Sequence, residues 1–431
     1  YEMLRSLVGS EMCIRDRCRS TRTDRRKETE LGHSRARLWR RCAGAGVAAA
    51  LAVGALVLPA APASADTTIT AGDQPFYSHY NLASIRSAGY TGDGVTIALI
   101  DGPVNSGIPE LQGAHIESYA PCSVGSQDKY WDHGTVIAQI LVSPQFGMAP
   151  GARLKAYTLS FMGDTTGSDC ALGNWDRGYS DLSLLIETAL NDGVDVITTS
   201  SSYPGYTEDM RWALARAITQ QVPVVACAGN DSVQNSTEWL PAWSGVVGVA
   251  AIETNGHASD YTNWGDPIST AALGRPIARS GVSLQRGEWW GTSFATPVVA
   301  GALALSMERW PRATGNQIMQ GLARTGVGGN GGQWNPYTGF GALDTYALLT
   351  TNPKDFPDEN PFMDKGEDSV PSRRDVADYA DGVVDPRKLH NDHSYSYRGV
   401  DERLAFSDQH DSPVNLGTSP RYHKRTNGKK K

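Results

Sequence analysis

Short apolar runs alternate with longer segments of helical pattern through the middle of the chain. Each run is bounded by glycine, proline or polar residues. Runs of this kind are typical of strands that are buried on both faces of a sheet. We therefore predict strands at residues 95–100, 153–160, 195–200, 222–228 and 245–252.

Helices are predicted in the intervening segments. Residues 181–193 and 207–221 are apolar at helical spacing, and the sequence DHGTVIAQIL at 132–141 is expected to open another helix. Strands that alternate with helices predict an α/β fold, with a doubly wound, mostly parallel sheet and helices on both faces. In such sheets the active site lies outside the carboxyl ends of the strands.

The first part of the chain has the pattern of an export signal. A basic flank precedes an apolar run from about Ala43 to Leu58, and Ala63-Ser64-Ala65 is a small-x-small cleavage sequence. The run is short for a membrane span, so we predict a secretory signal peptide that is cleaved after Ala65. Residues 1 to about 20 resemble translated sequencing-adapter read-through, and we exclude them.

These patterns predict a folded domain at 66–351 followed by a tail at 352–431. The tail is charged, rich in proline and aspartate, and without a sustained helix or strand period. We expect it to be mostly disordered, with a small binding module as the alternative. Only about ten residues of the range 66–351 precede the part in which strand and helix patterns can be read, so either the domain folds without a separate folding segment or a segment is missing from the sequence.

Charge and cysteine content narrow the classes of partner. The formal net charge of −7 argues against a nucleic-acid binder, and we expect a monomer that has no membrane partner after signal cleavage. Export permits a disulfide. Cys122 and Cys170 lie in polar, loop-like stretches, so we pair them and expect Cys227, in an apolar run, to stay buried and reduced. Three unpaired thiols are the alternative.

Polar residues that acyl transfer requires lie at predicted strand ends and helix starts. Asp101 and Asn230 follow predicted strands, His133 lies near a helix start, and Ser293 precedes an apolar helix with Pro297 in its expected first turn. A serine hydroxyl needs a base to take its proton, and histidine suits that role because its pKa lies near neutrality. A buried carboxylate orients the imidazole, and an amide can donate to the oxyanion.

These stretches resemble the motifs of the subtilisin-like serine proteases, the subtilases. ALIDGPVN, HGTVIAQI, ACAGN and GTSFATPVVAG match the aspartate, histidine, oxyanion-asparagine and serine motifs in the family's order, over about residues 74–350. The resemblance implies a subtilisin-like fold, a catalytic triad of Asp101, His133 and Ser293, and Asn230 as oxyanion donor. The simpler readings are a turn at Asp101 and helix caps at His133 and Asn230.

Two stretches depart from the family pattern. Gly102 and Pro103 follow Asp101, where the family usually has serine or threonine and then glycine. The substrate-binding strand of the family usually reads Ser-Leu-Gly, and here it reads Ser200, Ser201 and Ser202. The resemblance places the opposing substrate edge at Arg177 and Gly178, which together with the serines would pair with an extended peptide.

The resemblance implies a secreted serine endopeptidase that acts on peptides or proteins. A peptide-maturation acyltransferase could use the same triad, and an inactive binding protein on this scaffold is the third reading. No metal ligands and no cofactor are assigned, because the acidic loops show no clear ligand spacing. A structural calcium ion remains an open alternative.

Overall fold

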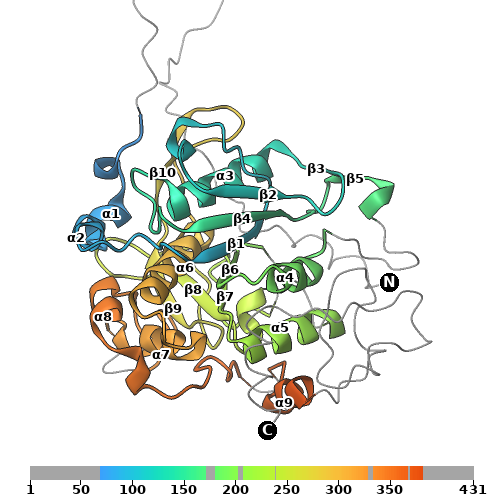
Figure 1. Ribbon diagram of the computed structural model, residues 1–431, viewed down its shortest axis with the longest axis vertical. Coiled ribbons are helices and arrows are strands. Elements are labelled where there is room, and N and C mark those ends of the chain that lie inside the picture. The colour runs from blue at the N-terminus through green and yellow to red at the C-terminus, as the bar shows by residue number, and fades with distance from the viewer. Residues whose placement is uncertain are drawn as a thin grey trace, which may run out of the picture.

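A parallel sheet of seven strands forms the centre of the molecule (Figure 1). The computed structural model describes residues 68–170, 180–201, 207–237, 239–328, 333–366 and 369–381. The strand order is β2-β4-β1-β6-β7-β8-β9, and neighbouring strands run parallel. These strands are β1 (Thr96–Asp101), β2 (Ile116–Tyr119), β4 (Arg153–Thr158), β6 (Val196–Thr199), β7 (Val224–Cys227), β8 (Val247–Ile252) and β9 (Thr270–Leu273).

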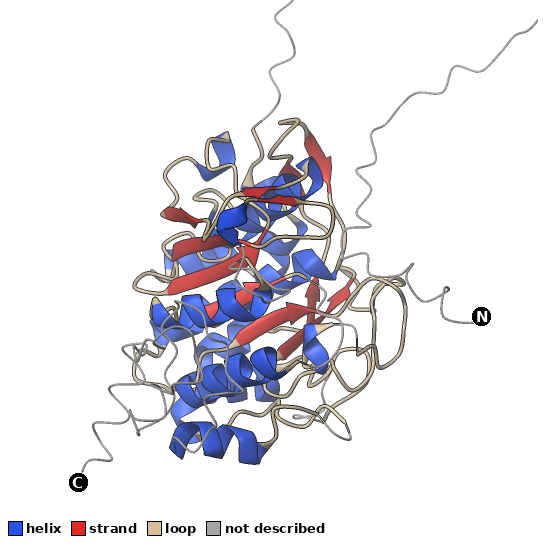
Figure 2. Cartoon of the chain, turned by 90° about the vertical axis from the view of Figure 1, so that its right-hand side faces the viewer, coloured by secondary structure: helices blue, strands red, loops and turns tan. Residues whose placement is uncertain are grey.

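Helices cover both faces of this sheet, as the side view in Figure 2 shows. Successive side chains of a strand point to opposite faces. Leu99 accordingly packs in one cluster with α3 (Asp128–Val142) and α6 (Thr292–Arg309). Ile100 packs in another with α4 (Leu182–Asn191) and α5 (Glu208–Gln220). The predicted α/β class is therefore confirmed.

Smaller elements surround the sheet. Two antiparallel pairs join β3 (Val124–Gly125) to β5 (Thr165–Thr166) and β10 (Ile277–Arg279) to β11 (Arg286–Glu288). The other α-helices are α1 (Pro75–His79), α2 (Leu82–Ser87), α7 (Gly315–Thr325), α8 (Thr345–Thr350) and α9 (Arg373–Asp381). Short 3-10 turns are η1 (Ala71–Asp73), η2 (Pro109–Leu111), η3 (Ser168–Cys170), η4 (Leu240–Ala242) and η5 (Pro353–Asp355).

The predicted strands and helices are all present, with some differences at their ends. Helix α3 begins at Asp128, so His133 lies in its second turn rather than at its start. Strand β2 was not predicted, because it lies at the edge of the sheet with mostly exposed side chains and has no apolar run. Strand β9 is buried but was not predicted, because two of its four residues are alanines, which have a low preference for strands.

The boundary predicted at residue 352 is wrong. Residues 353–366 and 369–381 include η5 and α9 and lie against the sheet domain. Trp212 and Ala215 of α5 pack with Tyr379 of α9, which is fully buried. The rest of the predicted tail, 382–431, and the predicted signal peptide lie outside the described residues.

Candidate active site

Asp101 and His133 form a buried hydrogen bond at the carboxyl end of β1. Asp101 is the last residue of the strand, and the distance from His133 Nδ1 to Asp101 Oδ1 is 2.7 Å. The exposed fractions of the two residues are 0% and 2%. The Gly102 backbone N–H also donates to Oδ1, at 2.7 Å. The carboxylate is thus held to orient the imidazole through Nδ1.

Glycines allow helix α3 to approach the end of β1 closely. A Cβ atom on Gly102 would lie 2.1 Å from the Tyr130 carbonyl oxygen, and one on Gly134 would lie 2.3 Å from the Gly102 carbonyl oxygen. Both distances are far below any tolerable contact. The glycine after Asp101, which departs from the family pattern, therefore lets α3 carry His133 up to the carboxylate.

Ser293 lies in the first turn of α6, and the next residue, Phe294, packs near His133. Gly291, at φ 146°, is the N-cap, and Ser293 is the second helical residue. The ring centroids of His133 and Phe294 are 5.6 Å apart. The structure therefore brings His133 to the start of α6. The Ser293 hydroxyl is buried and makes no hydrogen bond within the described part of the chain.

Pro297 is the sixth residue of α6, in the second turn, so the expectation of a first-turn position is wrong. Proline has no N–H, and its position removes the donor that would bond the carbonyl four residues earlier. That carbonyl belongs to Ser293, and the Ser200 hydroxyl donates to it at 3.0 Å. The Ser200 side chain is therefore bound to the backbone of Ser293 in α6. It does not point outward as the side chain of a peptide-binding strand would, so the expected pairing with a peptide concerns the main chain of residue 200 only.

Asn230 is joined to the first residue of α6. It follows β7, and its Oδ1 accepts hydrogen bonds from Thr292 N and Thr292 Oγ1, both at 2.9 Å. Thr292 Oγ1 in turn accepts from Gly229 N at 3.1 Å. Because the amide oxygen is held by Thr292, the amide NH₂ group lies on the other side of the side chain. The sequence did not single out Thr292, although it immediately precedes Ser293.

The remaining predicted site residues have different outcomes. Ser201 is buried, whereas Ser202, Arg177 and Gly178 lie outside the described residues. Cys122 and Cys170 form the expected disulfide, which joins the loop before β3 to η3. Cys227 is buried in β7 against Trp239 and is not part of a disulfide.

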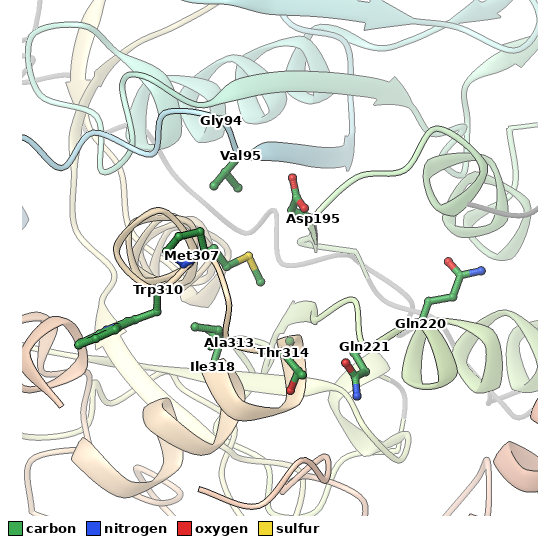
Figure 3. Close-up of a pocket in the computed structure, with 12 residues that line it drawn as sticks. Gly94, Val95, Asp195, Gln220, Gln221, Met307, Trp310, Ala313, Thr314 and Ile318 are labelled. Atoms are coloured by element: carbon green, nitrogen blue, oxygen red, sulfur yellow. The ribbon is translucent and has the colours of Figure 1, made fainter. Parts of the chain in front are cut away.

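A separate cavity of about 350 Å³ lies at the opposite end of the sheet (Figure 3). Its walls include Val95 and Asp195, which precede β1 and β6, and Gln221, which precedes β7. It is therefore at the amino ends of the strands, away from Asp101 and His133. In the parts of the chain that the structure describes, no group of three or more His, Cys, Asp or Glu side chains could hold a metal. No helix within those parts is long and apolar enough to span a membrane.

Comparison with known proteins decides the family. The model of the subtilase family matches residues 92–341, more than half of the chain. The chain belongs to the subtilase family. It is 28% identical to Subtilisin E of Bacillus subtilis over 256 residues, which cover 58% of this chain and 64% of that protein. It thus spans less than two thirds of the length of this curated relative.

Other relatives agree at the level of sequence and fold. Fervidolysin of Fervidobacterium pennivorans is 26% identical over 293 residues, which cover 60% of this chain and 41% of that protein. The crystal structure of MycP1 from Mycobacterium smegmatis has a TM-score of 0.55 at 24% identity, covering 70% of this chain and 90% of that chain. At this identity the MycP1 comparison shows similarity of fold alone.

Proposed function

We propose that this subtilase is a secreted serine endopeptidase that cleaves peptide bonds through an acyl-enzyme. The observation that carries the proposal is the buried 2.7 Å hydrogen bond between His133 Nδ1 and Asp101 Oδ1, in a chain whose Ser293 opens the helix beside it. Family membership adds independent support for this chemistry.

In the proposed reaction, His133 Nε2 takes the proton of the Ser293 hydroxyl while Ser293 Oγ attacks the scissile carbonyl. Asp101 holds the imidazole orientation and stabilises the imidazolium. The Asn230 NH₂ group donates to the oxyanion that forms, and His133 then gives its proton to the leaving amine. Water, activated by His133, releases the acyl group.

The substrate in this proposal is an extended peptide. Its main chain pairs with the backbone of residues 200–202 on one edge and with that of 177–178 on the other. The serine side chains at 200–202 provide no large apolar wall, so we propose no preference for large apolar side chains at the adjacent substrate position.

The deciding experiment labels Ser293 with an organophosphonate probe. We expect the probe to modify Ser293 in the wild-type protein, and the folded Ser293→Ala variant to lose peptide hydrolysis by on the order of a millionfold. Normal hydrolysis by a folded Ser293→Ala protein would contradict the proposal. Product mass separates hydrolysis, which adds water, from transfer to an amine, which does not.

Secretion is tested separately on the exported protein. We expect a mature N-terminus near Asp66, and N-terminal sequencing of the protein from the culture medium checks this.

A further inference from the structure

The hairpin of β10 and β11 is directly connected to the segment that carries Ser293. Trp289, which follows β11, donates its backbone N–H to Pro276 O at 3.0 Å and its Nε1–H to Ala278 O at 3.2 Å. Gly291 N donates to Gly274 O at 3.0 Å. Any shift of β10 is therefore transmitted to the residues just before the nucleophile.

Two glutamine side chains bond the edge of β10 that faces away from β11. Gln139 Nε2 donates to Arg279 O at 2.8 Å, and Arg279 N donates to Gln139 Oε1 at 2.9 Å. Gln74 makes the same pair of bonds with Ile277, since its Nε2 donates to Ile277 O and its Oε1 accepts from Ile277 N at 3.2 Å. Each amide thus takes the place of a residue in a neighbouring strand.

The two glutamines come from different parts of the molecule. Gln139 is in α3, six residues after His133, and its Nε2 also donates to Thr135 O at 3.1 Å within that helix. Gln74 precedes α1, far from the histidine in sequence. Of the two glutamines, only Gln139 therefore joins the helix that carries the base to the hairpin that precedes the nucleophile. The turn of the hairpin is bonded to the same helix by Asp132, whose Oδ1 accepts from Ser280 Oγ at 2.6 Å and from Val282 N at 2.9 Å, so Gln139 is the link to strand β10 itself.

The surroundings of Gln139 are buried, so water is not at hand to replace its hydrogen bonds to Arg279. Gln139 is fully buried, and Arg279 is 4% exposed and forms a buried ion pair with Glu110 at 2.7 Å. Water cannot easily replace a lost bond here, and a buried backbone group without a partner is costly. Gln74 is also buried, at 2% exposed, but its partner Ile277 is only partly buried, so the bonds of Gln74 lie nearer the surface than those of Gln139.

An aromatic contact completes the connection on the catalytic side. The ring centroids of Trp289 and Phe294 are 6.1 Å apart, and those of Phe294 and His133 are 5.6 Å apart. The hairpin, the start of α6 and the imidazole thus form one packed unit. Gln139 bonds β10 of that unit to α3, six residues after His133.

We propose that Gln139 is a positioning residue that sets the separation between His133 and Ser293 by bonding α3 to β10. The inference rests on the proposed function, because it matters only if these two residues react together. A displacement of about 1 Å between reacting groups can cost on the order of a hundredfold in rate. A side chain that fixes this separation therefore has a kinetic effect beyond its contribution to stability.

Gln139→Leu and Gln74→Leu form a matched pair, since each removes one glutamine amide from the same strand. We expect Gln139→Leu to lower kcat and the rate of phosphonate labelling of Ser293 by about tenfold or more, with KM little changed. We expect Gln74→Leu to stay within about twofold of wild type in both, although its thermal midpoint also falls. The downfield proton resonance of the His133–Asp101 hydrogen bond should change in the first variant only.

Each outcome decides the inference. If kcat falls by the same factor in the two folded variants, or falls in neither, the inference is overturned. If Gln139→Leu does not fold, Gln139→Asn keeps the amide but is one methylene shorter, and the same loss of kcat is expected. If neither variant folds, Gln139 is a stability residue and the inference is wrong. Failure of the proposed function is distinct, because wild-type Ser293 would then not react with the phosphonate.

Discussion

The side chain of Asn230 can perform two tasks because its two ends face different groups. Its oxygen accepts from Thr292 N, one of the N–H groups that the start of a helix leaves without an intrahelical partner. Its NH₂ group remains on the other side of the amide. The sequence offered a cap and an oxyanion donor as alternatives, and the geometry makes them compatible.

Substitutions at Asn230 that separate these tasks test the oxyanion assignment. Asn230→Leu removes both, so we expect turnover to fall by about a hundred- to a thousandfold, or roughly 2.7–4 kcal/mol. Its stability should also fall by about 1 kcal/mol. Asn230→Asp keeps an oxygen for Thr292 N but has no amide donor, so it should melt close to wild type and still lose turnover. Thermal midpoints and steady-state kinetics on the same preparations check both. A folded Asn230→Asp protein with normal turnover would remove Asn230 from the mechanism.

One carbonyl of helix α6 has no hydrogen-bond donor within the helix and is bonded by a residue at the end of a neighbouring strand. Pro297 supplies no N–H to the Ser293 carbonyl, and the hydroxyl of Ser200, directly after β6, donates to it instead. The end of β6 and the start of α6 are therefore joined through the backbone of Ser293, the proposed nucleophile. This bond accounts for a serine at position 200 without reference to a substrate.

A double-mutant cycle on Ser200 and Pro297 measures this dependence. Ser200→Ala alone leaves a buried carbonyl without a donor, and we expect a loss of about 1–3 kcal/mol in the free energy of unfolding. Pro297→Ala restores an N–H that can bond the Ser293 carbonyl, so Ser200→Ala should cost less in that background. Urea unfolding in a Ser293→Ala background, which prevents self-digestion, gives the four values. Additive losses would contradict the account.

The sequence predicted elements where a local pattern exists and missed contacts that span long distances along the chain. The apolar runs identified β1 and β7, and motif order placed Asp101, His133 and Ser293 in one site. The bond between Gln139 and Arg279 joins residues 140 positions apart, and a glutamine on a helix has no local feature that shows burial. Ser200 was assigned to substrate for the same reason, since only the fold brings its hydroxyl to the Ser293 carbonyl.

On the scale of the whole molecule, residues 353–366 lie at the amino ends of β8 and β9, opposite Asp101 and His133, and residues 369–381 continue onto α5. Gly245, just before β8, bonds this segment through its N–H to Phe362 O at 2.8 Å and through its carbonyl to Asn360 Nδ2 at 3.1 Å. Arg211 of α5 pairs with Asp375 of α9. The charged, proline-rich composition of this segment suggested disorder. It is ordered because its stabilising contacts are made with the domain, and such contacts leave no local pattern in the sequence.

Lys365 lies at the centre of this segment and is buried without a charged partner. Its Nζ donates to Pro267 O at 2.8 Å and to Ser269 Oγ at 2.7 Å. Asp266 and Asp364 line the same cavity of about 250 Å³, but no carboxylate in the described chain is within ion-pair distance of Nζ. Burial lowers the pKa of Lys365 from its usual 10.5 to about 7.

This lowered pKa predicts how the free energy of unfolding depends on pH. Between pH 7 and pH 10.5 the unfolded chain holds a proton on Lys365 that the native protein does not. Unfolding therefore becomes less favourable as pH rises through this window, by at most about 1.4 kcal/mol per pH unit, and the effect is flat below it. Lys365→Met removes the titrating group, so its stability relative to wild type should fall steadily as pH rises from 7 to 10.5.

Lys354 provides the matched control because it belongs to the same segment and is exposed. Lys354→Met loses the same charge without a buried site, so its unfolding free energy should stay parallel to that of wild type across the pH window. Urea unfolding of all three proteins in the Ser293→Ala background measures the differences. If the Lys365→Met curve also runs parallel to wild type, the Lys365 ammonium is not destabilised by burial. The buried Lys365 amine would then contribute no pH dependence to the packing of this segment on the domain in this range.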